Sequence, residues 1–185
     1  DYTTSNHMIV ENLINNAGFG NADAYLDTPW ELHKNMVDIN VVALMHLSHL
    51  YGNEMKKRRK GRILNVASVA AFSAGPYMSV YYASKAFVFS LSQAMYEELK
   101  GYGVSVTALC PGPTGTNFEN TAGLTNSKMF KVFGVEKADS VVKRGYKGMM
   151  RGKAIVYHSK VTYGFNIITR LVSRKCARNI AGRIN

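Results

Sequence analysis

Three neighbouring segments in the middle of the chain decide its fold: RILNVAS at residues 62–68, VYYASKAFVFSLSQAMYEELK at 80–100 and VSVTALC at 104–110. The first segment is short and apolar. The third is rich in β-branched residues and bounded by Gly103 and Pro111, so both are predicted strands. The second repeats apolar side chains at three- and four-residue intervals, which predicts a long helix. A strand, a helix and a second strand in this order favour a right-handed crossover within a parallel sheet.

The alternation of strands and helices continues on both sides of this unit. A short apolar strand at 12–15 leads into a glycine-containing turn, and a helix is predicted over 29–59, with a capping residue and a proline at its start and Gly61 at its end. A helix over 138–150 and a strand over 152–157 follow. The pattern predicts an α/β fold: a doubly wound, Rossmann-like parallel sheet with helices on both faces and a ligand site at the carboxyl ends of its strands.

Length and composition are those of an ordinary folded protein. The 185 residues suffice for one domain, at about 150 residues per domain. A hydrophobic fraction of 46% and a charged fraction of 19% disfavour disordered, collagen-like and coiled-coil chains. Two distant cysteines, Cys110 and Cys176, do not form a disulfide framework, and no apolar stretch reaches the roughly 18 residues that span a bilayer. We therefore expect a cytoplasmic protein.

The positive charge lies at one end of the chain. Its 23 Lys and Arg residues exceed its 12 Asp and Glu residues, for a net charge of +11. Residues 1–139 carry 12 basic and 12 acidic side chains, whereas residues 140–185 carry 11 basic and no acidic ones. Such an end suits a phosphate group, an anionic membrane or an acidic partner, although a solvated basic face is the commoner explanation.

Tyr81 and Lys85 form a pair with a chemical use. They are four residues apart near the start of the helix predicted over 80–100, so they share a face. A phenol with a pKa of about 10 transfers protons poorly at neutral pH, but an ammonium about 4 Å away favours the phenolate by roughly 4 kcal/mol. The Tyr81 hydroxyl could then act as a general acid or base in catalysis. A helix can also hold this pair for no chemical reason.

Other motifs accompany the pair. In chain order these are the Asn15-Asn16-Ala17-Gly18 turn, Asn40, Ser68, Tyr81-x-x-x-Lys85 and Pro111-Gly112-x-x-x-Thr116. By these motifs and their spacing, most of residues 10–157 resembles the classical short-chain dehydrogenase/reductase family. Ala67 stands where a second serine is common, and spacing makes Ser68 the catalytic serine.

The resemblance implies an enzyme that interconverts a carbonyl and a secondary alcohol with NADP or NAD, of which NADP is preferred. Tyr81 would pass a proton to or from the substrate oxygen, while Lys85 would lower the pKa of Tyr81 and bind the nicotinamide ribose. Ser68 would hydrogen-bond the substrate carbonyl. Asn40 would anchor a water that links Lys85 to solvent.

Cofactor contacts are implied in the same way. Asn16, Ala17 and Gly18 would lie against the adenosine side, where small residues permit close approach. Besides Tyr81 and Lys85, the contacts near the nicotinamide and pyrophosphate would be Pro111, Gly112, Thr114 and Thr116. The family's glycine-rich phosphate turn is not found before residue 15. We therefore expect the chain to lack the first β-α units, to be the catalytic C-terminal part of a larger domain, and to bind a dinucleotide poorly by itself.

The less regular stretch 117–139 corresponds to the family's flap over the substrate. It contains five apolar residues that either contact a largely apolar substrate or pack beneath the loop: Phe118, Leu124, Met129, Phe130 and Phe133. The expected substrate is a small, largely apolar carbonyl or alcohol.

A basic amphipathic helix is predicted over 161–185, following a catalytic part at 1–160. This tail could contact an anionic membrane peripherally, or dock on the domain or a sister subunit, and docking is preferred. An alternative function is a non-catalytic or truncated dehydrogenase-like scaffold that binds anionic lipid or a protein through the tail. Family members often pair through two long helices, here 29–59 and 80–100, so a homo-oligomer is expected. No motif indicates nucleic-acid binding.

Three remaining residues have unremarkable interpretations. His46 and His49 could form a metal pair, but no third ligand accompanies them, so no metal is expected. Tyr82 is three residues from Lys85 and is assigned to structure.

Overall fold

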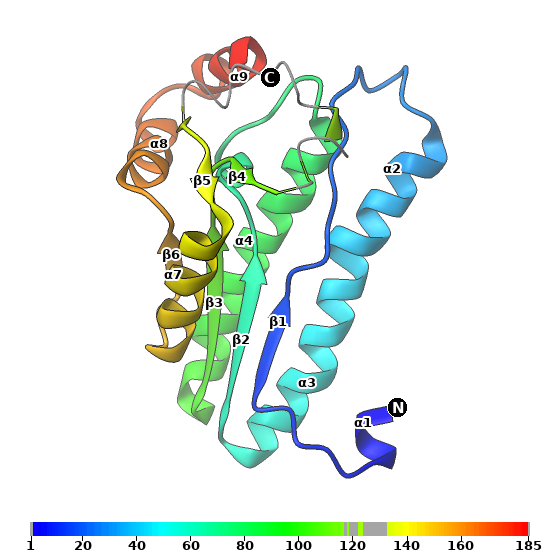
Figure 1. Cartoon of the computed structure of the whole chain (residues 1–185), viewed down its shortest axis with the longest axis vertical. Helices are drawn as coiled ribbons and strands as arrows, with labels where there is room; N and C mark the ends of the chain where they lie inside the picture. Colours follow the sequence, from blue (N-terminus) through cyan, green and yellow to red (C-terminus); the bar gives the residue numbers. More distant parts are fainter. Residues whose placement is uncertain (1, 117, 119–121, 124–132, 185) are drawn as a thin grey trace.

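A parallel sheet forms the centre of the computed structural model, which describes residues 2–116, 118, 122–123 and 133–184. Its strands are ordered β1 (Asn12–Asn15), β2 (Gly61–Val66), β3 (Val104–Cys110) and β6 (Ile155–Tyr157) (Figure 1). Every pairing is parallel, and Leu64 of β2 lies opposite Ile14 and Thr107. The predicted strands and the α/β fold class are confirmed.

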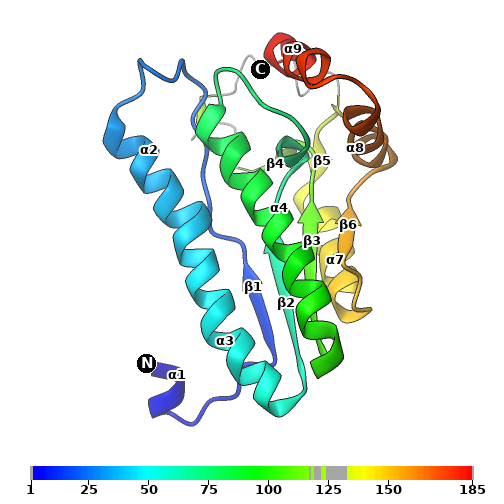
Figure 2. The ribbon, with the colours of Figure 1, turned by 180° about the vertical axis from the view of Figure 1, so that it is seen from behind.

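Helices cover both faces of the sheet. One face carries a long helical segment made of α2 (Trp30–Val37), η1 (Asp38–Ala43) and α3 (Leu44–Arg58), and beside it α4 (Ser79–Leu99) (Figure 2). The other face carries α7 (Ala138–Met150) (Figure 1). The described residues also form several short elements: α1 (Tyr2–Ser5), the 3-10 turns η2 (Val69–Phe72) and η3 (Lys100–Tyr102), and the parallel pair β4 (Thr114–Gly115) and β5 (Glu136–Lys137).

Side chains of the central strands point alternately to the two faces of the sheet and build an apolar core on each face. Ile63 packs with Met55, Val104 and Val106 beneath the long helices. Its neighbour Leu64 points the other way and packs with residues from α7, β3 and β6. Both faces of the central strands are buried, which is why these strands are apolar almost throughout.

The helix predicted over 29–59 differs from the structure at three points. Its middle, Asp38–Ala43, is π-helical. Pro29 occupies the N-cap position without a side-chain cap, because proline has no polar side chain that could accept a hydrogen bond. At the other end Arg59, with φ 56°, takes the left-handed position that we expected a glycine to provide.

The single helix predicted over 161–185 is wrong. The tail forms two helices, α8 (Lys160–Leu171) and α9 (Arg174–Ile184). The break arises because Val172 is extended and the Ser173 hydroxyl caps the second helix, accepting a hydrogen bond from Cys176 N at 3.2 Å.

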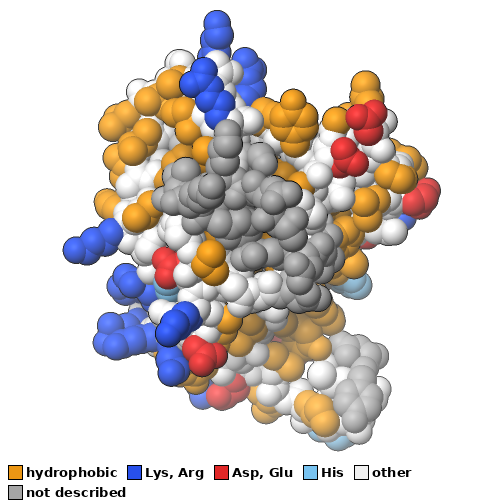
Figure 3. Space-filling model, turned by 45° about the horizontal axis from the view of Figure 1, so that its top comes forward, with side chains coloured by type: hydrophobic (Ala, Val, Ile, Leu, Met, Phe, Trp, Pro, Cys, Tyr) orange, Lys and Arg blue, Asp and Glu red, His pale blue; other side chains and the backbone are white. Residues whose placement is uncertain are grey.

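The tail docks on the domain, as preferred. Ala177 and Ala181 of α9 are buried, and Ala181 belongs to the same apolar cluster as Met78 and Tyr82. Cationic side chains remain exposed on α9, and Lys and Arg side chains gather at the top of Figure 3, the end of the molecule at which α9 lies in Figure 1.

Candidate active site

A cavity of about 320 Å³ opens at the carboxyl ends of β1, β2 and β3. Of the residues that the sequence proposes for catalysis or cofactor binding, those that line it are Asn16, Gly18, Ser68, Tyr81, Lys85, Pro111, Gly112, Thr114 and Thr116. Segments far apart in the sequence thus meet at the predicted edge of the sheet. Asn40 and Ala17 are not among the lining residues.

Lys85 lies buried on the first turns of α4, on the same face as Tyr81. Its Nζ donates a hydrogen bond to Val66 O at 2.8 Å and lies 5.8 Å from the centroid of the Tyr81 ring. Burial lowers the pKa of Lys85 to about 8. The ammonium is therefore mostly charged at neutral pH and loses its proton in mildly alkaline solution.

Tyr81 is buried as well, and its electrostatics differ from expectation. Burial raises the pKa of Tyr81 to about 12, while a hydrogen bond with Ser68 lowers it in part. The prediction that Lys85 brings this pKa down is not met in this structure, because desolvation dominates and the group that lowers the pKa of Tyr81 in part is Ser68, not Lys85. At neutral pH the Tyr81 hydroxyl carries its proton and can donate it.

Ser68 is held in place by the local backbone. It is extended, and its Oγ accepts a hydrogen bond from Ala70 N at 3.1 Å, which caps the 3-10 turn η2. Val69 N donates to Pro111 O at 2.8 Å and ties this turn to the end of β3. The Ser68 hydroxyl remains able to donate its own proton to Tyr81 or to a bound substrate.

Asn40 lies behind the cavity in the π-helical segment and orders the turn after β1. Its Nδ2 donates to Phe19 O at 2.9 Å and Ser84 Oγ at 3.1 Å, and its Oδ1 accepts from Phe19 N at 3.0 Å. The backbone at Gly18 passes close to the side chains of Asn40 and Lys85. A Cβ at this position would lie 2.9 Å from Asn40 Oδ1 and 3.4 Å from Lys85 Nζ. Only glycine permits this approach without a shift.

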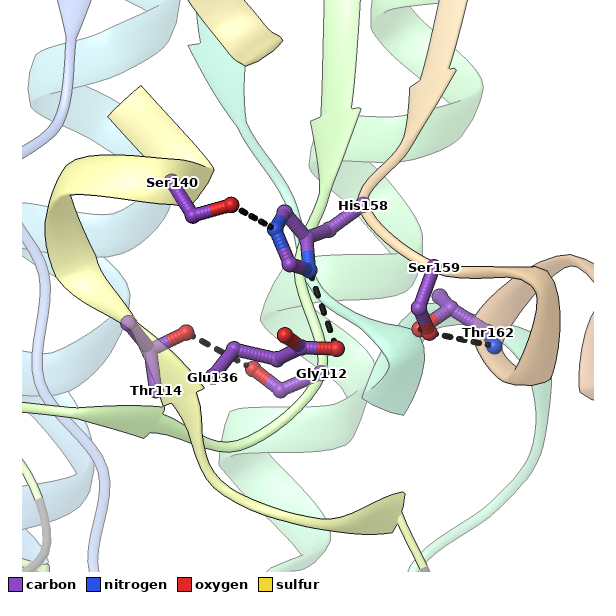
Figure 4. A network of polar contacts seen from close by, with 7 residues as sticks. All are labelled: Gly112, Thr114, Glu136, Ser140, His158, Ser159 and Thr162. Atoms are coloured by element: carbon purple, nitrogen blue, oxygen red, sulfur yellow. Dashed lines mark hydrogen bonds and ion pairs between the residues drawn. The ribbon is translucent and has the colours of Figure 1, made fainter. Parts of the chain in front are cut away.

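The segment after β3 is tied to a buried polar cluster that the sequence interpretation missed (Figure 4). Thr114 Oγ1 donates to Gly112 O at 3.0 Å, and Thr114 pairs with Glu136 across β4 and β5. Glu136 Oε1 lies 3.1 Å from Nδ1 of buried His158, whose Nε2 is 3.2 Å from Ser140 Oγ. The cluster joins β6, α7 and the cavity wall. No local sequence motif predicts this cluster.

Apolar side chains line the rest of the cavity. Met78, Val142 and Phe118 do so, and Phe118 packs against the Tyr81 ring at 5.3 Å between centroids. Tyr82, assigned to structure from its spacing, is buried and lines the cavity too. Phe133 packs on Phe165 of α8. The remaining apolar residues proposed for the flap, Leu124, Met129 and Phe130, lie outside the described residues.

The cavity fits the nicotinamide half of a dinucleotide better than the whole molecule. Glycines at 18 and 112 leave room for close approach, and Lys85 and Tyr81 present polar groups. Lys85 is the single cation among the described lining residues, and its ammonium group already donates a hydrogen bond to Val66 O. The described residues therefore supply little to neutralise a pyrophosphate.

The described residues contain no cluster of three or more His, Cys, Asp or Glu side chains that could hold a metal ion, and His49 contacts Asn53. None of the described helices is long and apolar enough to cross a membrane. Burial also raises the pKa of the Cys110 thiol.

Comparison with known proteins gives consistent results. The family model of the short chain dehydrogenases matches residues 3–126. Mouse 17-beta-hydroxysteroid dehydrogenase type 3 is 33% identical over 138 residues, which cover 73% of this chain and 42% of that protein. The probable oxidoreductase EphD of Mycobacterium tuberculosis is 33% identical over 121 residues, covering 65% of this chain and 20% of that protein.

A solved structure shows the same arrangement. The short-chain dehydrogenase from Sphingobium yanoikuyae in complex with NADPH matches with a TM-score of 0.75 and 27% identity, over 87% of this chain and 63% of that one. The chain spans from 20% to 42% of the length of the curated relatives it matches.

Proposed function

Because this chain belongs to the short-chain dehydrogenase family, we propose that it is the catalytic part of an NAD(P)-dependent oxidoreductase that interconverts a carbonyl and a secondary alcohol. The observation that carries the proposal is the meeting of Ser68, Tyr81 and Lys85 in one cavity, with Ser68 hydrogen-bonded to Tyr81. A scaffold function without catalysis has no such support.

In the reducing direction, the nicotinamide, when bound, supplies the hydride that reaches the carbonyl carbon. The Tyr81 hydroxyl, protonated at neutral pH, donates its proton to the carbonyl oxygen. Ser68 donates a hydrogen bond to the same oxygen and offsets its developing negative charge. The buried Lys85 ammonium then stabilises the phenolate left on Tyr81. In the oxidising direction the alcohol would give up its hydride to the bound nicotinamide, and Tyr81 would accept the alcohol proton once it has lost its own.

Asn40 acts in this scheme as a positioning residue. Its side-chain amide is engaged by Phe19 and Ser84, so it holds the Gly18 turn against Lys85. The water relay to Lys85 stays a prediction.

For the cofactor we propose NADP, with NAD as the alternative. Support comes from the relative from Sphingobium yanoikuyae, whose structure contains NADPH. The contacts would come from Asn16, Ala17 and Gly18 on one side and from Pro111, Gly112, Thr114 and Thr116 on the other.

The substrate we propose is largely apolar. Met78, Tyr82, Phe118 and Val142 line the cavity beside Tyr81. One relative, the mouse enzyme, is named for a hydroxysteroid, a large apolar alcohol.

The decisive variant is Tyr81→Phe, which removes the proton donor and keeps the ring that packs on Phe118. In the whole protein, we expect reduction of an apolar ketone by NADPH, followed by NADPH absorbance, to fall by roughly a hundredfold or more. The matched control is Tyr146→Phe, which alters an exposed tyrosine of α7 and should leave the rate unchanged. Activity of Tyr81→Phe within about tenfold of the original would overturn the assignment.

A further inference from the structure

A second hollow, about 610 Å³ in volume, lies at the outer edge of the sheet. Its floor is the edge strand β6, and its walls are α7 and the start of α8. It shares no lining residue with the active-site cavity. We refer to this hollow as the basic groove.

Six exposed cations line the basic groove: Lys143, Arg144, Lys147, Arg151, Lys153 and Lys160. No acidic side chain is among its lining residues, and residues 140–185 contain none. The ion pairs found in the described part of the chain involve other side chains. Lys and Arg side chains gather along the left of Figure 3, the side on which α7 and α8 lie in Figure 1. These charges repel one another and would be offset by a bound anion.

The cations converge on the hollow from two sides. Lys143 and Lys147 lie one turn apart on α7, and Arg151 follows as the residue that caps its C-terminus, so the three span about 12 Å along the helix axis. Lys153 and Lys160 approach from the turn before β6 and from α8. The N-terminus of α8 also borders the groove through Ser159 and Lys160, so the positive end of a twelve-residue helix adds to the field.

Shape and charge together point to a small polyanion. The volume suits a small molecule, and cations that surround a hollow suit a compact anion better than a flat bilayer or a long duplex. The groove also offers aromatic surface, because the Tyr157 and Tyr163 rings lie 5.2 Å apart in an edge arrangement. We propose that the basic groove binds a small molecule carrying two or more phosphate groups, independently of the proposed catalysis.

Calorimetric titration of the protein with inorganic tripolyphosphate tests this directly. We expect saturable binding to one site, which weakens as salt is added, and binding of single inorganic phosphate that is about tenfold weaker or less. The triple variant Lys143→Gln, Lys147→Gln, Arg151→Gln should bind tripolyphosphate about tenfold more weakly or not at all. Because all three side chains are exposed, the variant should fold, which circular dichroism checks.

The matched control removes the same charge elsewhere. Arg174→Gln, Lys175→Gln, Arg178→Gln changes three exposed cations of α9 outside the groove and should bind tripolyphosphate like the original protein. Equal losses in both triple variants would show a general charge effect and overturn the proposal. Groove-dependent binding to phosphatidylglycerol vesicles without binding of tripolyphosphate would overturn it too, because the groove would then be a lipid surface.

Discussion

Lys85 is a buried cation whose proton is held less tightly in the folded chain than in the unfolded one. Its pKa falls from 10.5 to about 8 on burial. Below pH 8 both states hold the proton, and the folded state bears a desolvation cost of about 3 kcal/mol. Between pH 8 and 10.5 the unfolded state binds more protons, so the free energy of unfolding contributed by Lys85 rises with pH.

Lys85→Met removes this titration. We expect the variant to be more stable than the original at pH 7 and its advantage to shrink by about 2 kcal/mol when urea unfolding is repeated at pH 9.5. The raised pKa of the Cys110 thiol, which lowers stability in alkali, acts equally on both proteins and cancels in the difference. An advantage that does not change with pH would mean that Lys85 titrates normally. Lys85→Met also removes the hydrogen bond to Val66 O, and this loss changes the free energy of unfolding by about the same amount at both pH values.

At the scale of elements, α7 approaches the sheet through two glycines. A Cβ on Gly148 would lie 2.2 Å from Val156 Cγ2, and one on Gly145 would lie 2.7 Å from Leu109 Cδ2. Both partners are buried in the cluster under α7, and valine has little rotamer freedom to yield. The small residues therefore set the distance between helix and sheet.

Gly148→Ala should destabilise the fold by roughly 1–3 kcal/mol, because the added methyl overpacks this contact. Gly164→Ala is the paired control: it lies inside α8 with nothing within 4 Å of the added Cβ, so it should stabilise the chain by about 0.5–1 kcal/mol. Thermal melts of the two variants should move in opposite directions. A stabilising Gly148→Ala would show that α7 can move away from β6 at little cost.

Local pattern predicted some elements well and others not. The helix expected over 80–100 is found at 79–99, and the strand expected over 104–110 matches, because long apolar periodicity and flanking Gly or Pro are local signals. The π-helical turn at Asn40 and the break before Arg174 depend on which backbone or hydroxyl partners the folded chain provides. Their sequence signals are weak, since β-branched residues near Asn40 also occur in ordinary helices.

The candidate site also combines features that local sequence predicts with features that depend on the folded chain. Tyr81, Lys85 and Ser68 could be proposed from spacing, and the structure brings them together. The pKa of Tyr81 could not be predicted, because its direction depends on how completely the folded chain excludes water from the phenol. The cluster of Glu136, Ser140 and His158 was also missed, because it joins three elements that no spacing rule connects.

For the whole molecule, the two long helices leave apolar surface uncovered. Five side chains of the segment from α2 to α3 are 40–44% exposed: Val37, Ile39, Val42, Met45 and Leu47. Phe87 on the neighbouring α4 is 40% exposed. Exposed apolar side chains on two neighbouring helices are typical of a subunit interface. They support the proposal that two chains pair through the helices 29–59 and 80–100.

Met45→Glu would place a charge in such an interface, where burying it without a partner is costly. We expect sedimentation velocity to show a dimer or larger assembly for the original protein and a shift toward monomer, with at least about a tenfold weaker association, for Met45→Glu. Leu171→Glu is the control, because Leu171 is 81% exposed at the end of α8, away from these helices, and its charge should leave the assembly intact. If the original protein sediments as a monomer at micromolar concentration, or if the two variants dissociate it equally, pairing through these helices is wrong.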